Sequence, residues 1–120
     1  MTWKAEIEGL HDFFADWFSG SAQESDLTRL SDALEADFTI VDPNGAEHTA
    51  DETVASVDNA RGSRATRIET RNHRLLSESA DFVVARYEEW HDGTKGRIST
   101  VVFRKRDEGL GWLTVQETWL

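Results

Sequence analysis

The stretch that decides the fold is DFTIVDPNGAEHTADE, residues 37–52. Its first half alternates apolar and polar side chains, which places Phe38, Ile40 and Asp42 on one face of a β-strand. The DPNG sequence that follows is typical of a turn, and AEHT after it suits a second, short strand. A strand, a turn and another strand are therefore expected to stand together here.

Three helices are expected around this stretch. The first has an apolar stripe at steps of four and three, formed by Trp3, Ile7, Leu10, Phe14 and Trp17. The second is capped by Ser25 and has its apolar face at Leu27, Leu30 and Leu34. The third begins at Thr49 and Glu52, which have the spacing of a capping box, and ends near Gly62.

The chain beyond the third helix has the pattern of a meander. The expected strands span residues 66–76, 82–91, 96–106 and 111–119. Polar turns separate them, and the middle turn contains Asp92-Gly93, a hairpin signal. We therefore predict an α+β fold in which three N-terminal helices cover one face of a curved, mainly antiparallel sheet. No linker composition divides the chain, so we expect residues 1–120 to form a single domain.

The charge balance of the chain limits its partners. The 120 residues carry 23 acidic and 13 basic side chains, for a net charge of -10. Such a surface repels nucleic acid and anionic lipid, and we expect neither as a partner. No apolar run approaches the ~18 residues that a membrane span needs, and the N-terminus lacks the basic start of a signal peptide. We expect a cytoplasmic protein.

Metal and cofactor sites are not expected from the motifs. The chain has no cysteine, which excludes disulfides, thiolate metal sites and a cysteine nucleophile. Its four histidines, His11, His48, His73 and His91, show neither HxH nor HExxH spacing. The phosphate-binding loop, the dinucleotide fingerprint and the nucleophile elbow are also missing from the sequence.

The order of elements resembles the nuclear transport factor 2-like superfamily, the cystatin-like cone shared by SnoaL-like cyclases and ketosteroid isomerases. The resemblance covers essentially the whole chain, and its sharper parts are VDPNG after LEADFTI, YEEW at 87–90 and TVQETW at 114–119. Ketosteroid isomerases have a similar Asp-Pro-x-Gly in which the Asp shuttles a proton. The resemblance therefore implies that Asp42 is a candidate general base.

Other isomerase positions differ in this chain. Phe13 and Phe14 lie near the position of the isomerases' helix Tyr, and Ser99, in STVVF, matches the position of their strand Asp. A phenylalanine cannot donate a hydrogen bond, and a serine is a weaker donor than a desolvated carboxylic acid. Steroid isomerisation is therefore not expected, and the chain looks more like the uncharacterised SnoaL-like branch.

Two Glu-x-Trp motifs, at 88–90 and 117–119, are the basis for the expected pocket. The register of the superfamily favours the strand faces that carry them as inward-facing. Strand 96–106 adds Ser99, and the first helix adds its apolar stripe. The predicted pocket residues are Phe14, Trp17, Arg86, Glu88, Trp90, Ser99, Glu117 and Trp119. Several carboxylates in one dry cavity would raise some of their pKa values and offer a proton shuttle.

Each of these residues also has a purely structural interpretation. Asp42 suits the first position of a type I turn, where its carboxylate bonds local amides. Arg86 with Glu88 or Glu117 could form a buried ion pair. The two tryptophans of the motifs could be core or dimer contacts.

The first functional hypothesis is a cone protein that binds an unknown small molecule, without demonstrated catalysis. We expect a homodimer formed through the outer face of the sheet, because the helices cover only one face and the outer surface is rich in aromatic residues. One alternative is a lyase or isomerase that uses Asp42 as general base on a small carbon acid, with Glu88 or Glu117 assisting. The other is a protein-association module, which the superfamily also supplies.

Overall fold

The computed structural model of the chain describes residues 2–120. Its helical segments are α1 (Trp3–Ser19), the 3₁₀ turn η1 (Glu24–Leu27), α2 (Thr28–Ser31) and α3 (Ala50–Asn59). Its strands are β1 (Leu34–Val41), β2 (Glu47–Thr49), β3 (Ile68–Glu78), β4 (Phe82–His91), β5 (Thr94–Lys105) and β6 (Leu110–Trp119). The four strands expected after the third helix are confirmed to within two residues at every end.

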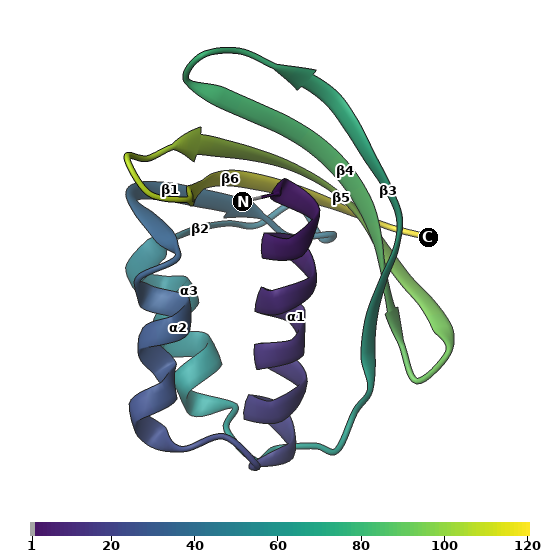
Figure 1. Cartoon of the computed structure of the whole chain (residues 1–120). Coiled ribbons are helices and arrows are strands. Elements are labelled where there is room, and N and C mark those ends of the chain that lie inside the picture. Colours follow the sequence, from purple (N-terminus) through teal and green to yellow (C-terminus); the bar gives the residue numbers. More distant parts are fainter. Residues whose placement is uncertain (1) are drawn as a thin grey trace.

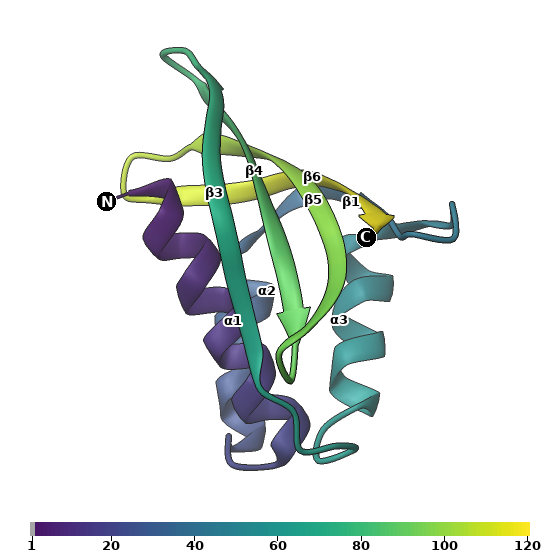
Figure 2. The ribbon, with the colours of Figure 1, turned by 90° about the vertical axis from the view of Figure 1, so that its right-hand side faces the viewer.

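All six strands form one sheet in the order β2-β1-β6-β5-β4-β3. Every neighbouring pair is antiparallel except β1 and β6, which are parallel. The sheet is strongly curved, and α1, α2 and α3 lie on its concave side (Figure 1). Turned by 90°, the molecule shows β3 and β4 running alongside α1, with α3 on the other side of the cone (Figure 2). The predicted α+β fold is confirmed.

Helix α1 forms for the reasons that the sequence gives. The Thr2 hydroxyl accepts the Ala5 N–H at 3.2 Å, and Gly20 ends the helix with a φ of 86°, a conformation that glycine adopts without strain. Trp17 is fully buried, and its indole Nε1 donates to the carbonyl of Val57 at 2.6 Å. This bond ties the end of α1 to α3. No helix within residues 2–120 has the length and apolar character needed to cross a membrane.

The second helical segment differs from the prediction. Its N-cap is Gln23 rather than Ser25, in a capping box with Asp26, and the segment splits into η1 and α2. It also ends at Ser31, so Leu34 opens β1 instead of closing a helical face. Leu34 is paired with Trp112 of β6 and buried, and this long-range pairing overrides the local helical spacing.

The local signals around α3 and the middle hairpin are confirmed. The Thr49 hydroxyl accepts the Glu52 N–H at 3.2 Å, and the Glu52 carboxylate accepts the Thr49 N–H at 2.9 Å. Between β4 and β5, Asp92 and Gly93 have φ values of 52° and 77°. Two positive φ values in a two-residue loop are typical of a type I′ turn, which matches the twist of the strands it joins.

A bulge sets which side chains of β6 face the helices. Val102 pairs with Thr114, but the next residue of β5, Phe103, pairs with Trp112. Leu113 is therefore the extra residue, and Trp112 rather than Leu113 points inward, where it is 2% exposed. The inner face of β5 carries Ser99, Val101 and Phe103, all fully buried, as the sequence indicated. These strands form the floor of the cone.

Candidate functional site

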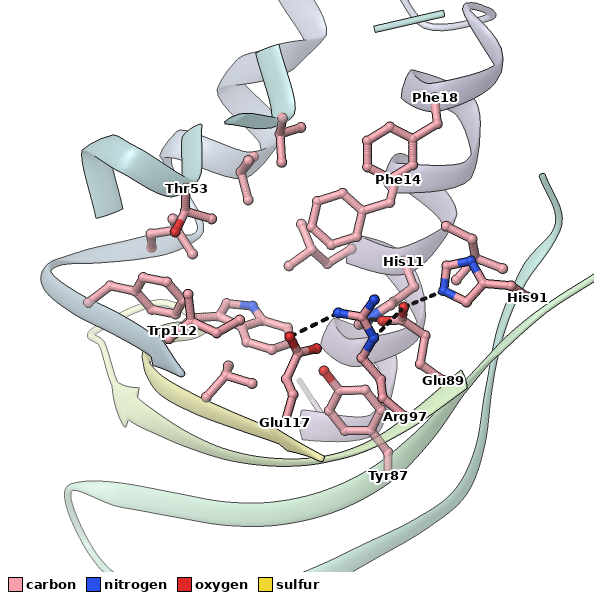
Figure 3. Close-up of a pocket in the computed structure, with 18 of the residues that line it drawn as sticks. His11, Phe14, Phe18, Thr53, Tyr87, Glu89, His91, Arg97, Trp112 and Glu117 are labelled. Carbon is pink, nitrogen blue, oxygen red and sulfur yellow. Dashed lines mark hydrogen bonds and ion pairs between the residues drawn. The ribbon is translucent and has the colours of Figure 1, made fainter. Parts of the chain in front are cut away.

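A cavity of about 250 Å³ lies between α1, α3 and the inner face of the sheet. Aromatic and aliphatic side chains form most of its wall, among them Phe14, Phe18, Phe38, Ile40, Val57 and Trp112. Polar side chains gather at the end formed by β4, β5 and β6 (Figure 3). The cavity is thus an apolar hollow with one polar end, which is the usual composition of a small-molecule site.

Helix α1 presents a face of aromatic rings to this cavity. Phe14 and Phe18 are one turn apart, and their rings stack with centroids 5.9 Å apart. His11 lies one turn before Phe14, edge-on to its ring at 5.5 Å. The helix therefore brings one titratable side chain to the polar end of an otherwise apolar wall.

His11 and Glu89 form a buried pair across α1 and β4. The side chains are 5% and 11% exposed, and His11 Nε2 is 2.8 Å from Glu89 Oε1. His11 Nδ1 is 2.8 Å from the carbonyl oxygen of Ile7. His91 Nε2 contacts the second carboxylate oxygen of Glu89. A carbonyl and a carboxylate only accept, so both ring nitrogens of His11 face hydrogen-bond acceptors.

The protonation of Glu89 follows from these contacts. Burial alone would raise the pKa of Glu89, because a carboxylate loses its hydration. The hydrogen bonds to His11 and His91 and the charge of Arg97 outweigh burial, and the pKa of Glu89 is held well below its usual range. Glu89 is therefore an ionised, structural carboxylate.

Glu117 lies in the same cavity in a different environment. Arg97 Nη1 donates to Glu117 Oε1 at 3.0 Å, and the Ser99 hydroxyl is 3.5 Å from Oε2. Burial raises the pKa of Glu117, which Arg97 opposes and the charge of Glu89 reinforces. The two carboxylates of the cavity thus have pKa values shifted in opposite directions, the pattern of one fixed charge and one exchangeable proton.

Tyr87 adds a neutral donor to this cluster. It lies on the inner face of β4, is 2% exposed, and points its hydroxyl toward Glu117 and Arg97 (Figure 3). Burial raises the pKa of Tyr87 well above its ordinary value, and the charges of Glu89 and Glu117 add to this. The phenol stays protonated and can donate a hydrogen bond to a bound molecule.

Metal binding has no support from this geometry. Within residues 2–120, no three His, Cys, Asp or Glu side chains are grouped in a way that could hold a metal ion. The polar end of the cavity offers hydrogen-bonding groups, the charge of Arg97 and a carboxyl group, that of Glu117, whose pKa is raised by burial.

Three of the predicted pocket residues lie at or beside the cavity. Phe14 and Glu117 line it, and Ser99 lies fully buried behind Glu117. Trp17 is one turn away from the lining, packed in the core with its ring 5.6 Å from that of Phe13. That these side chains bind a ligand stays a prediction.

The inward placement of Arg86, Glu88 and Trp90 is corrected by the structure, because all three lie on the outer face of β4. Arg86 Nε donates to the Thr100 hydroxyl at 2.9 Å, and Trp90 Nε1 donates to Glu88 Oε1 at 3.0 Å. The inward face of β4 is the alternate set, Val83, Ala85, Tyr87, Glu89 and His91. Val83, Ala85 and Tyr87 of this set pack into the core, whereas the other register would bury the guanidinium of Arg86.

The placement of Trp119 is corrected as well. It lies at the end of β6, is 53% exposed, and its indole Nε1 donates to Asn44 Oδ1 at 3.2 Å. The strand reaches past the cone at this point, so alternation no longer implies burial. The Arg97 guanidinium lies 5.2 Å from the Trp119 ring centroid.

Asp42 does not line the cavity. It follows the last residue of β1, and its carboxylate accepts the N–H groups of Asn44 at 2.9 Å and Ala46 at 3.1 Å. His48 Nε2 is 3.0 Å from its second oxygen. The hydrogen bond from His48, with those from the two amides, lowers the pKa of Asp42. The structural interpretation as a turn residue describes this geometry, and a base facing the cavity does not.

Seven polar residues of the cavity lining were not among the predicted ones: His11, Thr53, Arg64, Tyr87, Glu89, His91 and Arg97. A signal for two of them was present in the sequence. Arg97 is two residues before Ser99 and so shares its strand face, and His11 is four residues after Ile7 on the apolar stripe of α1. Tyr87 and Glu89 required the correct face of β4.

Comparisons with solved structures extend this description. The chain is similar to an NTF2-like protein of unknown function from Pseudomonas aeruginosa, with 29% identity over 98% of each chain and a TM-score of 0.91. An NTF2-like protein from Cytophaga hutchinsonii matches all of both chains with 16% identity and a TM-score of 0.70. An uncharacterised protein with a cystatin-like fold from Caulobacter vibrioides matches 92% of this chain and 84% of its own, with 11% identity and a TM-score of 0.69. No family model matches the chain, and no curated protein matches it.

Proposed function

The chain belongs to the nuclear transport factor 2-like superfamily, and we propose that it binds a small, mainly apolar molecule in the cavity of its cone. The observation that carries the proposal is the hollow of about 250 Å³ between the helices and the sheet. A cone filled by its own side chains would have favoured a module that only associates with other proteins. An aromatic wall with a few convergent polar groups supports ligand binding instead.

The size and wall of the cavity indicate the kind of molecule. Typical small-molecule sites measure about 300–1,000 Å³, so this cavity suits a ligand smaller than most drugs. Phe14, Phe18, Phe38 and Trp112 offer ring faces and edges, which favour an aromatic group. Glu117 and the Tyr87 hydroxyl can hydrogen-bond one polar group at the other end of the ligand.

A cavity-filling variant tests this proposal. Val57 lines the cavity from α3, whereas its neighbour Ser56 is exposed. We expect 3-phenyl-1-propanol to shift the amide resonances of the cavity wall in the wild type. Val57→Trp should weaken this binding about 100-fold by occupying the space, and Ser56→Trp should leave it unchanged. Undiminished binding in Val57→Trp, or the absence of binding in the wild type, would overturn the proposal.

Catalysis by Asp42 as general base, the alternative suggested by the isomerases, has little support from the geometry. The Asp42 carboxylate is already bonded to three local donors and lies outside the cavity lining. A general base must come within hydrogen-bond reach of the proton that it removes. If a turnover is found, Asp42→Asn should leave its rate unchanged.

A homodimer through the outer face of the sheet is the second part of the proposal. The three helices all lie on the concave side, so the outer face of β4, β5 and β6 is uncovered (Figure 2). A shallow hollow of about 620 Å³ lies there, with half-buried Ile98 and Val102 and several threonines in its lining. Arg86 is the charged residue of this lining. In a chain of net charge -10, such a weakly charged face is where two copies can meet with least repulsion.

The dimer is tested by its mass in solution. Light scattering at micromolar concentration and moderate salt should give twice the chain mass. Val102→Asp should convert the protein to a monomer, because a two-fold axis brings the new charge close to its own copy. Ser56→Asp, on the opposite side of the molecule, should stay dimeric. A monomeric wild type would refute this part of the proposal.

A further inference from the structure

Arg97 connects the cavity to a basic groove on the surface. Three residues line both the cavity and this groove: Arg64, His91 and Arg97. Lys95 adds a further positive charge to the groove. The groove also contains one carboxylate, that of Asp92, which already accepts the backbone N–H of Arg67 at 2.8 Å. In an acidic protein, the region where the cavity meets the surface is therefore basic and attracts anions.

The guanidinium of Arg97 has unused donors. Of its five N–H groups, one on Nη1 is bonded to Glu117 at 3.0 Å. Nε is buried without a hydrogen-bond partner in the part of the chain that the structure describes, and it lies 3.7 Å from Glu89. Arginine binds a carboxylate through two parallel hydrogen bonds, which needs free donors of this kind. Arg97 therefore has N–H donors left for the carboxylate of a ligand, in addition to its contacts with Glu117 and Glu89.

The charges around Arg97 determine whether a ligand carboxylate must bind together with a proton. Arg97 already pairs with Glu117, and Glu89 already pairs with His11. A ligand carboxylate would add one negative charge to a poorly hydrated site, which is costly unless a proton is added too. Glu117 is the group suited to take it, since burial already raises its pKa. Two carboxyl groups that meet in such a site share a proton.

The other charged and titratable groups around Glu117 come from four segments. They are His11 from α1, Tyr87, Glu89 and His91 from β4, Arg97 from β5, and Arg64 from the segment after α3. The parts of α3 and β1 that line the cavity contribute Thr53, Val57, Phe38 and Ile40, which do not titrate. The pKa of Glu89 lies far below neutrality and that of Tyr87 far above it, so neither changes charge near neutral pH.

We propose that the ligand is a small aryl carboxylic acid, bound as its carboxylate to Arg97 and taken up together with one proton on Glu117. This rests on the proposed function of the cavity and names its ligand class. No covalent bond changes: the proton comes from solvent to a Glu117 carboxyl oxygen, and the protonated Glu117 donates to the ligand. The aryl group occupies the wall of Phe14, Phe18 and Trp112.

Calorimetry with a matched pair of probes tests the proposal. Titrations with 3-phenylpropionate and 3-phenyl-1-propanol are run in phosphate and in Tris, whose ionisation enthalpies differ. We expect the acid to bind with the uptake of one proton. Its affinity should fall about tenfold per pH unit above the pKa of Glu117 in the free protein. The alcohol should bind without proton uptake.

Two variants separate the roles of the two residues. Glu117→Gln removes the charge that a proton would neutralise, so at pH 8 it should bind the acid about tenfold more tightly than the wild type, without proton uptake. Arg97→Gln should lower the affinity for the acid about 10- to 100-fold and change the affinity for the alcohol by no more than about twofold. Arg86→Gln, the same change on the outer face, should alter neither. Alcohol binding also reports that each variant is folded.

The outcomes distinguish this inference from the proposed function. Binding of the alcohol without binding of the acid would overturn the assignment of the ligand as a carboxylic acid, and the proposal that the cavity binds a small molecule would stand. Acid binding without proton uptake, or an unchanged affinity in Glu117→Gln, would overturn the role of Glu117. If neither probe binds to the wild type, the cavity proposal and this inference both fail.

Discussion

Glu88 and Glu89 are neighbours in sequence and lie on opposite faces of β4. Glu88, on the outer face, accepts a hydrogen bond from Trp90, two residues away on the same strand. Glu89, on the inner face, contacts His11 of α1, 78 residues away in the chain. The outer carboxylate therefore makes its contacts within the sheet, whereas the inner one joins a helix to the sheet. Of the two glutamates, only Glu89 links a helix to the sheet and lines the cavity.

The largest difference in stability between the two faces is expected when an aromatic residue of each face is changed to alanine. Phe103, on the inner face of β5, is fully buried with its ring 4.8 Å from that of Trp112. Phe103→Ala should lower the free energy of unfolding by about 4 kcal/mol. Phe82, on the outer face of β4, is 39% exposed, so Phe82→Ala should lower the free energy of unfolding by less than about 1 kcal/mol. Urea denaturation measures both, and equal losses would contradict the assignment of the two faces.

The paired carboxylates come next. Glu89→Ala removes the buried carboxylate that pairs with His11 and one of the two that Arg97 contacts, and it should lower the free energy of unfolding by about 3 kcal/mol. Glu88→Ala should cost less than about 0.5 kcal/mol, because its contacts lie on the outer face of the sheet, close to solvent. The same denaturation experiment at pH 7 compares them. A larger loss of stability for Glu88→Ala than for Glu89→Ala would contradict the assignment of Glu89 to the inner face of β4 and Glu88 to the outer face.

This pair also shows how far the sequence determines the structure. Turn and cap signals, such as Asp92-Gly93 and the box of Thr49 with Glu52, located the elements well because they act over a few residues. The inward face of β4 could not be chosen in the same way. Both of its alternating sets contain a glutamate and several apolar residues, so alternation alone does not separate them. The structure separates them through packing against α1, which no local pattern contains.

The candidate site was predictable to the extent that its strands had a clear inner face. On β5, alternation gave Ser99 the correct orientation, and the same reasoning extends to Arg97. On β6, Glu117 was found, although Trp119 lies beyond the cone. For Asp42 the same reasoning fails. β1 ends at Val41, and a side chain beyond the end of a strand no longer follows the alternation of that strand.

The pH dependence of stability should differ in sign for the two inner carboxylates. Glu89 has a pKa below its ordinary value of 4.5, so its contribution is present above pH 4.5 and is lost as the pH falls further. Glu117 has a raised pKa, so its contribution is present below pH 4.5 and is lost as the pH rises through the folded-state value.

Denaturation of the wild type, Glu89→Gln and Glu117→Gln between pH 3 and pH 8 measures this. The stability difference between wild type and Glu89→Gln should shrink in acid. The difference between wild type and Glu117→Gln should become less favourable to the wild type as the pH rises. Two difference curves of the same slope would show that the carboxylates share one environment.

The smallest expected effect lies on the outer face. The Arg71 guanidinium is 4.0 Å from the ring centroid of Trp90, and both side chains are half-buried. A double-mutant cycle with Arg71→Ala and Trp90→Ala should give a coupling of about 0.5 kcal/mol. A coupling as large as the loss expected for Glu89→Ala would mean that the outer face is also buried, for instance in the dimer.

The most direct test of the central claim, that the ligand occupies the inner cavity, uses the absence of cysteine from the chain. Single cysteines are placed at Thr53, which lines the cavity, and at Thr100, on the outer face. Their reaction rates with methyl methanethiosulfonate are compared with and without saturating 3-phenylpropionate and 3-phenyl-1-propanol. We expect a probe that binds to slow the reaction of Thr53→Cys and leave that of Thr100→Cys unchanged. Protection of Thr100→Cys alone, or of neither cysteine, would contradict the account.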